Sequence, residues 1–228
     1  AFVSGFPVGM SIWKSIASTA DWHNSSRLTS KKSIKCNSDA AQASDGDITY
    51  DFQNGMGKWT SDVSAYMSWQ WKRIPKGFSV VTYDGNGVSP RFIPHDLNAE
   101  PEMIWCKGRD SSYDWKVWHK DLHNGGASAA PYYLTLNSSA ADVADSNVFG
   151  GAANTLPSST YWVTGANATI NQNGTDQLAY LFSSVDGISK CGTYTGSSSA
   201  FTITTGFQPR LFILKGLASS RNWILFDT

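Results

Sequence analysis

Three short segments of the chain share one pattern of hydrophobic and polar positions. Each begins with an apolar run that ends in a lysine, continues through seven mostly polar residues, and resumes at a tryptophan. Ser or Thr residues stand four and five positions after the lysine, and Asp or Asn precedes the tryptophan. Such self-similarity is typical of repeat architectures. The three lysine–tryptophan pairs are Lys14 and Trp22, Lys107 and Trp115, and Lys215 and Trp223.

This pattern predicts a β-hairpin in each copy. The apolar run forms one strand, and the Ser/Asx-rich stretch turns the chain, because these side chains bond nearby backbone amides. A second strand then returns from the tryptophan. In the second copy Trp115 and Val117 alternate with Lys116, as on a strand with one buried face. We expect the repeated lysines and tryptophans to belong to the scaffold.

A second repeated block precedes each later hairpin. Ala65-Tyr66-Met67 aligns with Ala179-Tyr180-Leu181, and Gly77-Phe78-Ser79 aligns with Gly187-Ile188-Ser189. The chain therefore divides into a first repeat unit over residues 1–100 and a second over 101–228, which includes the opening hairpin of a third. Both can lie in one continuous β-domain. Because the chain begins just before one hairpin and ends inside another, we expect an excerpt of a longer polypeptide or a subunit whose ends pair with neighbours.

The rest of the chain favours short strands. Runs of β-branched and aromatic residues are separated by Gly, Asn and Pro turns. The sequence thus predicts an all-β fold, an antiparallel β-sandwich-like architecture built from internal repeats. Polar residues 25–47 are expected to form a long loop, and residues 140–144 suit a short helix. Further strands are expected at 79–83, 91–93, 132–136, 161–163, 178–183 and 200–204.

Composition narrows the classes of partner. The 228 residues include 18 basic and 18 acidic side chains, so the formal net charge is zero. Binders of nucleic acid or anionic membranes need a basic footprint, so neither partner is expected. No apolar run reaches the roughly 18 residues of a membrane span, so no insertion is expected. The three cysteines, Cys36, Cys106 and Cys191, cannot form a closed disulfide framework, and free thiols fit a reducing cytoplasm.

The sequence offers no distinctive chemistry, so neither an enzyme nor a cofactor is expected. His119 and His123 lie four residues apart, but no further donors stand at metal-ligand spacing, and no metal site is expected. No Gly-x-Ser-x-Gly motif accompanies the many serines. The two glutamates, Glu100 and Glu102, lack the apolar context that would tune a catalytic carboxylate pair.

Tryptophans outside the repeated positions are better candidates for binding. Trp59, Trp69, Trp71 and Trp118 do not recur between units in this alignment. Trp69 and Trp71 are two apart, so on a strand their rings would point the same way. Such a pair could stack on a sugar or form a contact between subunits, and ordinary burial in the core is the alternative. We treat the four tryptophans as candidate contacts for a glycan or a partner.

Several stretches also match one specific family. They are residues 77–83, 94–97, 101–103, 114–120, 180–182 and 206–210. Through them the chain resembles an uncharacterised β-repeat domain of tailed-bacteriophage virion proteins, particularly those of marine and cyanobacterial phages. It departs from the usual form of that domain in residues 25–47 and in an insertion at residues 69–75.

The resemblance implies a non-enzymatic structural protein of the virion, assembled in the host cytoplasm. The expected part is a domain of a tail fibre or related appendage that displays loops for host attachment, and the family has no established catalytic residues. The implied partners are other virion proteins, further copies of the chain in a homotrimer by analogy to phage fibres, and a host surface glycan. Two alternatives stay open, a carbohydrate-binding (lectin-like) module and a capsid decoration or head-fibre protein.

Overall fold

The structure is a computed structural model that describes residues 2–50, 53–58, 66–123, 131–217 and 220–227. Nearly all of its regular structure is β-strand, in antiparallel sheets that pack together, so the predicted all-β sandwich-like fold is confirmed. The helical segments among these residues are single turns: α1 (Ala168–Asn171), η1 (Arg27–Thr29) and η4 (Gly151–Ala153).

Two large sheets follow the same plan. Their strand orders are β5-β4-β3-β2-β8 and β14-β13-β12-β11-β16-β9. In each sheet a hairpin is flanked on one side by the strand that follows it and on the other side by a strand from later in the chain. The first sheet contains β2 (Met10–Ser15), β3 (His23–Ser26), β4 (Lys32–Lys35), β5 (Ala43–Ser44) and β8 (Tyr66–Trp71). The second contains β9 (Phe78–Asp84), β11 (Met103–Gly108), β12 (Lys116–His119), β13 (Tyr132–Thr135), β14 (Val143–Ala144) and β16 (Asp176–Phe182).

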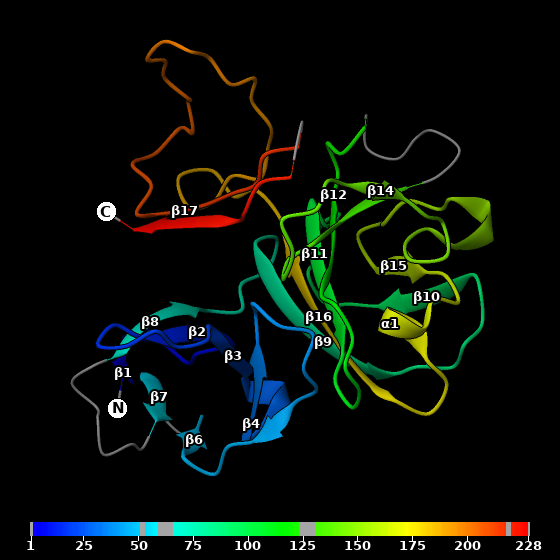
Figure 1. Cartoon of the computed structure of the whole chain (residues 1–228), viewed down its shortest axis with the longest axis horizontal. Helices are drawn as coiled ribbons and strands as arrows, with labels where there is room; N and C mark the ends of the chain where they lie inside the picture. Colours follow the sequence, from blue (N-terminus) through cyan, green and yellow to red (C-terminus); the bar gives the residue numbers. More distant parts are fainter. Residues whose placement is uncertain (1, 51–52, 59–65, 124–130, 218–219, 228) are drawn as a thin grey trace.

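The three predicted hairpins are confirmed, and their strands pair in the same register. β2 pairs with β3, β11 pairs with β12, and β17 (Leu211–Leu214) pairs with β18 (Ile224–Asp227) in a sheet of its own. The residues that face each other at the open end are Met10 and Ser26, Met103 and His119, and Leu211 and Asp227. In Figure 1 the three hairpins surround a common centre.

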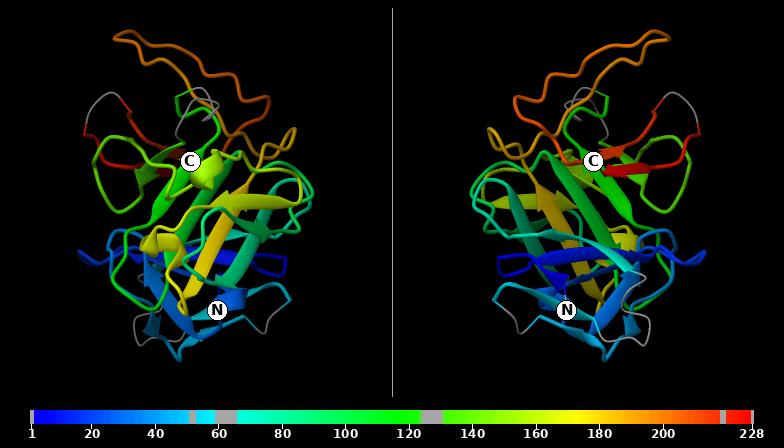
Figure 2. Two further views of the ribbon diagram at one scale, coloured as in Figure 1. Left: turned by 90° about the vertical axis from the view of Figure 1, so that its right-hand side faces the viewer. Right: turned by 90° about the vertical axis from the view of Figure 1, so that its left-hand side faces the viewer.

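One strand crosses from the first unit into the second. β9 follows β8 in the sequence, but it pairs with β16 of the second sheet along its whole length, from Asp84 opposite Asp176 to Phe78 opposite Phe182. The two units therefore share a sheet as well as a core. Figure 2 shows β9 and β16 side by side in the second sheet.

Hydrophobic side chains pack on both faces of the large sheets. A central cluster draws on all three units and includes Trp22, Trp115 and Trp223. The small sheet of β1 (Phe2–Val3), β6 (Ile48–Thr49) and β7 (Gly55–Lys58) packs near Trp13 of the first large sheet. The pair β10 (Arg91–Pro94) and β15 (Tyr161–Thr164) packs against Trp118 of the second. The arrangement is layered around a shared centre.

Three predictions about segments are wrong. Residues 25–47 are not one long loop, because β4 and β5 extend the first sheet beyond β3 and bury Ser33 and Ile34. Residues 140–144 contain no helix, since Val143 and Ala144 pair with Tyr133 and Tyr132 as a short edge strand. Residues 200–204 form no strand, and their side chains are mostly exposed.

The structure also corrects the alignment of the second repeated block. Lys14 lies opposite Met67 and Lys107 lies opposite Leu178, so Met67 corresponds to Leu178 and not to Leu181. Trp69 then corresponds to Tyr180, and Trp71 to Phe182. Residues 69–75, which contain the end of β8 and the turn after it, therefore correspond to residues 180–186 of the second unit.

The turn after β8 explains a second, one-residue error, the matching of Gly77 to Gly187. An isolated bridge joins Ile74 to Phe78 in the first unit and Val185 to Ser189 in the second. The third residue of each turn has a positive φ, 62° at Lys76 and 74° at Gly187. Glycine is the usual choice for this conformation, but in the first unit a lysine adopts it. Matching glycine to glycine therefore shifted this part of the alignment by one residue.

Candidate functional site

Each hairpin loop is closed by its repeated lysine. The ammonium group of Lys14 donates a hydrogen bond to the backbone carbonyl of Ala20, across the loop. The equivalent pairs are Lys107 with Tyr113 and Lys215 with Arg221. Because a lysine carries three donors, this bond leaves others for partners outside the loop.

An asparagine beyond each of the first two hairpins braces the tryptophan. Asn37 Oδ1 accepts a hydrogen bond from the backbone N–H of Trp22 at 3.0 Å, and Asn37 Nδ2 donates to the Asp21 carboxylate at 3.0 Å. In the second unit, Asn137 makes the same contacts with Trp115 at 2.9 Å and Asp114 at 2.8 Å. Sequence reasoning missed these asparagines, although each begins the repeated string Asn-Ser-x-Ala-Ala. We call residues 37–41 and 137–141 the acceptor loops.

Two hydrogen bonds join each unit to the next, and we call this pair of bonds the joint. Lys107 Nζ donates to the carbonyl of Asp39 at 2.9 Å, and Trp115 Nε1 donates to the carbonyl of Lys35 at 2.8 Å. The third hairpin makes the same joint with the second unit. There Lys215 Nζ donates to the Ser139 carbonyl at 2.9 Å, and Trp223 Nε1 donates to the Thr135 carbonyl at 2.9 Å. The structure thus gives the second and third of the predicted scaffold lysine–tryptophan pairs a specific role between units.

The joint between the first and second units buries a positive charge. Lys107 is fully buried, and this burial lowers the pKa of its ammonium group from 10.5 to about 8, against the opposing effect of Asp39 and Asp114. A buried ammonium is costly unless its N–H groups are hydrogen-bonded. The carbonyls of Asp39 and Tyr113 supply those bonds, so the site suits a donor and not a hydrophobic side chain.

A second contact between units starts from the aromatic partner of the repeated tryptophan. Trp22 stacks on Trp69 with ring centroids 5.3 Å apart, and Trp115 stacks on Tyr180 at 6.1 Å. The Tyr180 hydroxyl donates to Asn24 Oδ1 in the first unit at 2.5 Å. At the equivalent position, Trp69 Nε1 donates to the Asp227 carboxylate in the third hairpin at 3.0 Å. The first unit therefore contacts the third as the second contacts the first.

Of the four candidate tryptophans, Trp69 and Trp71 lie in the first large sheet. Trp69 and Trp71 do lie on one strand, half-buried against the central cluster. Both correspond to aromatic residues of the second unit, so the expectation that they do not recur is wrong. Trp59 lies outside the described residues.

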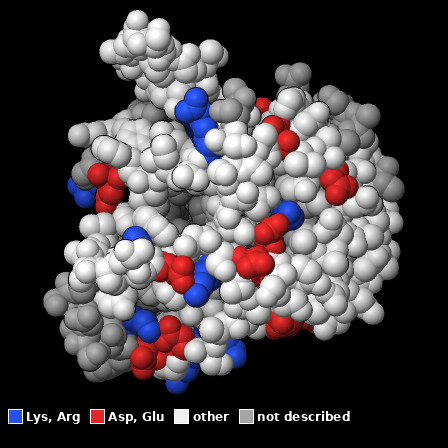
Figure 3. Space-filling view, viewed as in Figure 1, with Lys and Arg blue, Asp and Glu red and all other residues white. Residues whose placement is uncertain are grey.

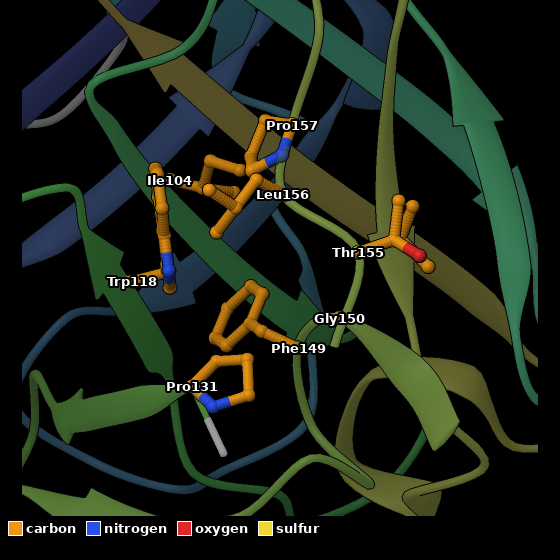
Figure 4. A pocket seen from close by; sticks show the side chains of 9 residues that line it. Ile104, Trp118, Pro131, Phe149, Gly150, Thr155, Leu156 and Pro157 are labelled. Carbon is orange, nitrogen blue, oxygen red and sulfur yellow. The ribbon is translucent and has the colours of Figure 1, made fainter. Parts of the chain in front are cut away.

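Trp118 is not available to a glycan, because its side chain is only 5% exposed. It lines a pocket of about 10 Å³ together with Ile104, Pro131, Phe149 and Leu156 (Figure 4). That volume is about one water molecule, so the pocket has no room for a sugar ring. The prediction of a surface contact at Trp118 is therefore wrong, because β10 and β15 and the chain around Phe149 cover that face of the sheet.

The two histidines considered as metal ligands have different partners. His119 Nδ1 accepts the Asp121 N–H at 3.1 Å, whereas His123 pairs with Asp142 at 2.6 Å. Within the described ranges, no three His, Cys, Asp or Glu side chains group as metal ligands would. Burial raises the pKa of the Cys106 thiol to about 12, so this cysteine is protonated at neutral pH.

Comparison with known proteins places the chain in one family. No helix in the described part of the chain is long and apolar enough to cross a membrane. No curated protein matches the sequence, and no solved structure does. The model of a family described as a domain of unknown function (DUF7483) matches residues 12–228, a span that holds all three hairpin loops and both joints. The chain therefore belongs to the DUF7483 domain family.

Proposed function

We propose that this chain is a structural module of a tailed-phage virion, a domain of a tail fibre or related appendage. Its work is to hold surface loops in fixed positions for contact with the host surface or with neighbouring virion proteins. The resemblance of residues 77–210 to virion β-repeat domains supplies the context. The observation that carries the proposal is the joint, which recurs with the same donors and with carbonyl acceptors. Units joined in one repeated way are suited to building a stiff body.

One segment stands out from this body as a surface for contact. Residues 192–204 project from the sheets in Figure 2, and every side chain in this stretch is exposed. Tyr194 and Phe201 are each 49% exposed, and their rings lie 5.6 Å apart. Exposed aromatic side chains are enriched at contact sites. Several copies of such a segment on one particle would bind by avidity.

The proposal is tested by locating the chain on particles. Antibodies raised against the purified chain are bound to virions of the phage that encodes it and seen by immunogold electron microscopy. We expect label at the tail or its appendages, in a few copies per particle. Label over the head at a copy number near that of the capsomers would replace the proposal with a decoration protein, and unlabelled particles would overturn both.

A carbohydrate-binding module is the second candidate function. The observation that favours it is that Trp69 and Trp71 lie on one strand and are only half-buried. Binding of the purified chain to host surface polysaccharide is compared with that of a Trp69→Ala/Trp71→Ala double variant. Phe92→Ala removes a half-exposed aromatic residue elsewhere and serves as control. Binding that survives the double variant would remove this platform.

A further inference from the structure

The first hairpin carries the donor half of a joint without an acceptor. Lys107 and Lys215 each bond a carbonyl of a neighbouring unit, whereas the carbonyl of Ala20 in its own loop is the only one that Lys14 bonds in the described part of the chain. Trp115 and Trp223 each donate their indole N–H across a joint. Among the described residues, the indole N–H of Trp22 has no such partner.

The third unit lies where that acceptor belongs. The Trp69–Asp227 hydrogen bond joins the first unit to β18, just as the Tyr180–Asn24 bond joins the second unit to β3. The three hairpins therefore follow one another around a centre and not along a line (Figure 1). Figure 3, in the same view, shows a hollow in the surface between the three units. The first unit thus already bonds the third through Trp69, and the two bonds of a joint are the part that is missing.

β18 is more exposed than the equivalent strands of the first two units. Phe226 is 58% exposed. Its counterparts by register, Ser25 and Trp118, are 1% and 5% exposed. In each complete unit the cover comes from chain after its own hairpin, at Tyr50 beside Ser25 and at Phe149 beside Trp118.

We infer that a third acceptor segment binds Lys14 and Trp22 and closes a ring of three units. This segment is a strand that pairs with the edge of β18 that no described strand occupies, and it ends in an Asn-Ser-x-Ala-Ala loop. Its strand would present one carbonyl to Trp22 Nε1, and its loop would present another to Lys14 Nζ. Both acceptor loops of the described chain are occupied. A second copy therefore has none to offer without opening a joint, so the occupant is an additional segment of this repeat type, with a strand and an acceptor loop like those of residues 27–41. This inference does not depend on a virion origin.

The experiment supplies the missing segment. Asp227 holds the register position of Ser26, so residues 27–41, which contain β4 and the first acceptor loop, are appended after Asp227 in place of Thr228. We expect the appended chain to have a Tm about 4–8 °C higher, the change that two added hydrogen bonds would give in a protein of this size. A scrambled segment of the same composition is the control.

Substitutions in the donor half show where the segment binds. Trp22→Phe and Lys14→Met should each remove about half of the gain in Tm, and the double variant should remove it. Trp223→Phe alters an occupied joint, so it should lower both melting temperatures and leave the gain unchanged. The inference is overturned if the appended segment raises Tm no more than the scrambled one, or if the gain survives the double variant.

Discussion

Lys107 is the residue in which the requirements of the joint are most visible. Its ammonium group is fully buried, with the carbonyls of Asp39 and Tyr113 as acceptors. Burial lowers its pKa to about 8, whereas an unfolded chain would hold the proton until about pH 10.5. Between those values the unfolded state binds more protons than the folded state, so this residue makes the protein more stable as pH rises.

This linkage gives a measurable difference between the wild-type chain and a Lys107→Met variant. The free energy of unfolding of the wild-type chain, minus that of the variant, should increase between pH 8 and pH 10.5. The slope should be at most about 1.4 kcal/mol per pH unit. Urea denaturation followed by tryptophan fluorescence measures it.

The comparison must be made against the variant, because other groups act in the opposite direction. Burial raises the pKa of Cys36 and Cys106 to about 12, so these thiols oppose the stabilisation once the unfolded thiols ionise near pH 9. Cys106 contributes equally to both proteins and cancels in the difference, whereas Cys36 cancels only in part, because the charge of Lys107 lowers the pKa of its thiol. A difference that is flat across this range would show that Lys107 does not lose its proton in the folded state.

The braces should matter about equally in the two units. Asn137→Ala removes the bonds to the Trp115 N–H and the Asp114 carboxylate, so we expect a loss of about 1–3 kcal/mol in the free energy of unfolding. Asn37→Ala should cost a similar amount. The exposed Asn173 makes a matched control, whose change to Ala should cost less than about 0.5 kcal/mol. Equal effects at all three positions would contradict the brace.

For single residues, the sequence predicts which positions are equivalent between units better than it predicts what those residues contact. The lysine and tryptophan of each hairpin are visible as repeated letters, and the structure places them in equivalent contacts. Their acceptors are not visible, since Lys107 bonds a carbonyl 68 residues away and Trp115 one 80 residues away. A backbone carbonyl leaves no signature in the side-chain pattern, so the joint could not be derived from the sequence.

Among the elements, strands were predictable where apolar residues run or alternate. β9, β10, β13, β15 and β16 lie within two residues of their predicted bounds. The errors arise where tertiary pairing outweighs composition. Polar β4 is a strand because β3 offers it an edge, whereas residues 200–204 have the pattern Ala-Phe-Thr-Ile-Thr but no neighbouring strand in the described structure.

The contrast between paired and unpaired aromatic segments can be tested by limited proteolysis. Phe201 and Phe92 are similarly exposed, at 49% and 50%, but Phe92 lies on β10, which pairs with β15. A protease needs an extended segment that can leave the surface, and a paired strand resists this. Chymotrypsin should therefore cut first at Tyr194 or Phe201, as mass spectrometry of early fragments would show. First cleavage at Phe92 would contradict the assignment of 192–204 as an unpaired segment.

At the scale of the whole molecule, the fibre proposal predicts an oligomer in solution. If the chain works in a fibre, copies should associate, and we expect a mass near three times 24.8 kDa by size exclusion with light scattering. A monomer at all concentrations would weaken the fibre proposal and favour an autonomous binding module.

The joint also determines which sequence changes a unit tolerates. Its acceptors are main-chain carbonyls, and the residues that carry them differ: Lys35 in one unit and Thr135 in the other, Asp39 in one and Ser139 in the other. A substitution on the acceptor side therefore leaves the bond intact, provided that the strand keeps its path. In the two bonds of the joint itself, only the donor lysine and tryptophan act through their side chains. Units with unrelated loops could thus be exchanged between proteins by recombination and still fit together, which lets the surface diversify while assembly is kept.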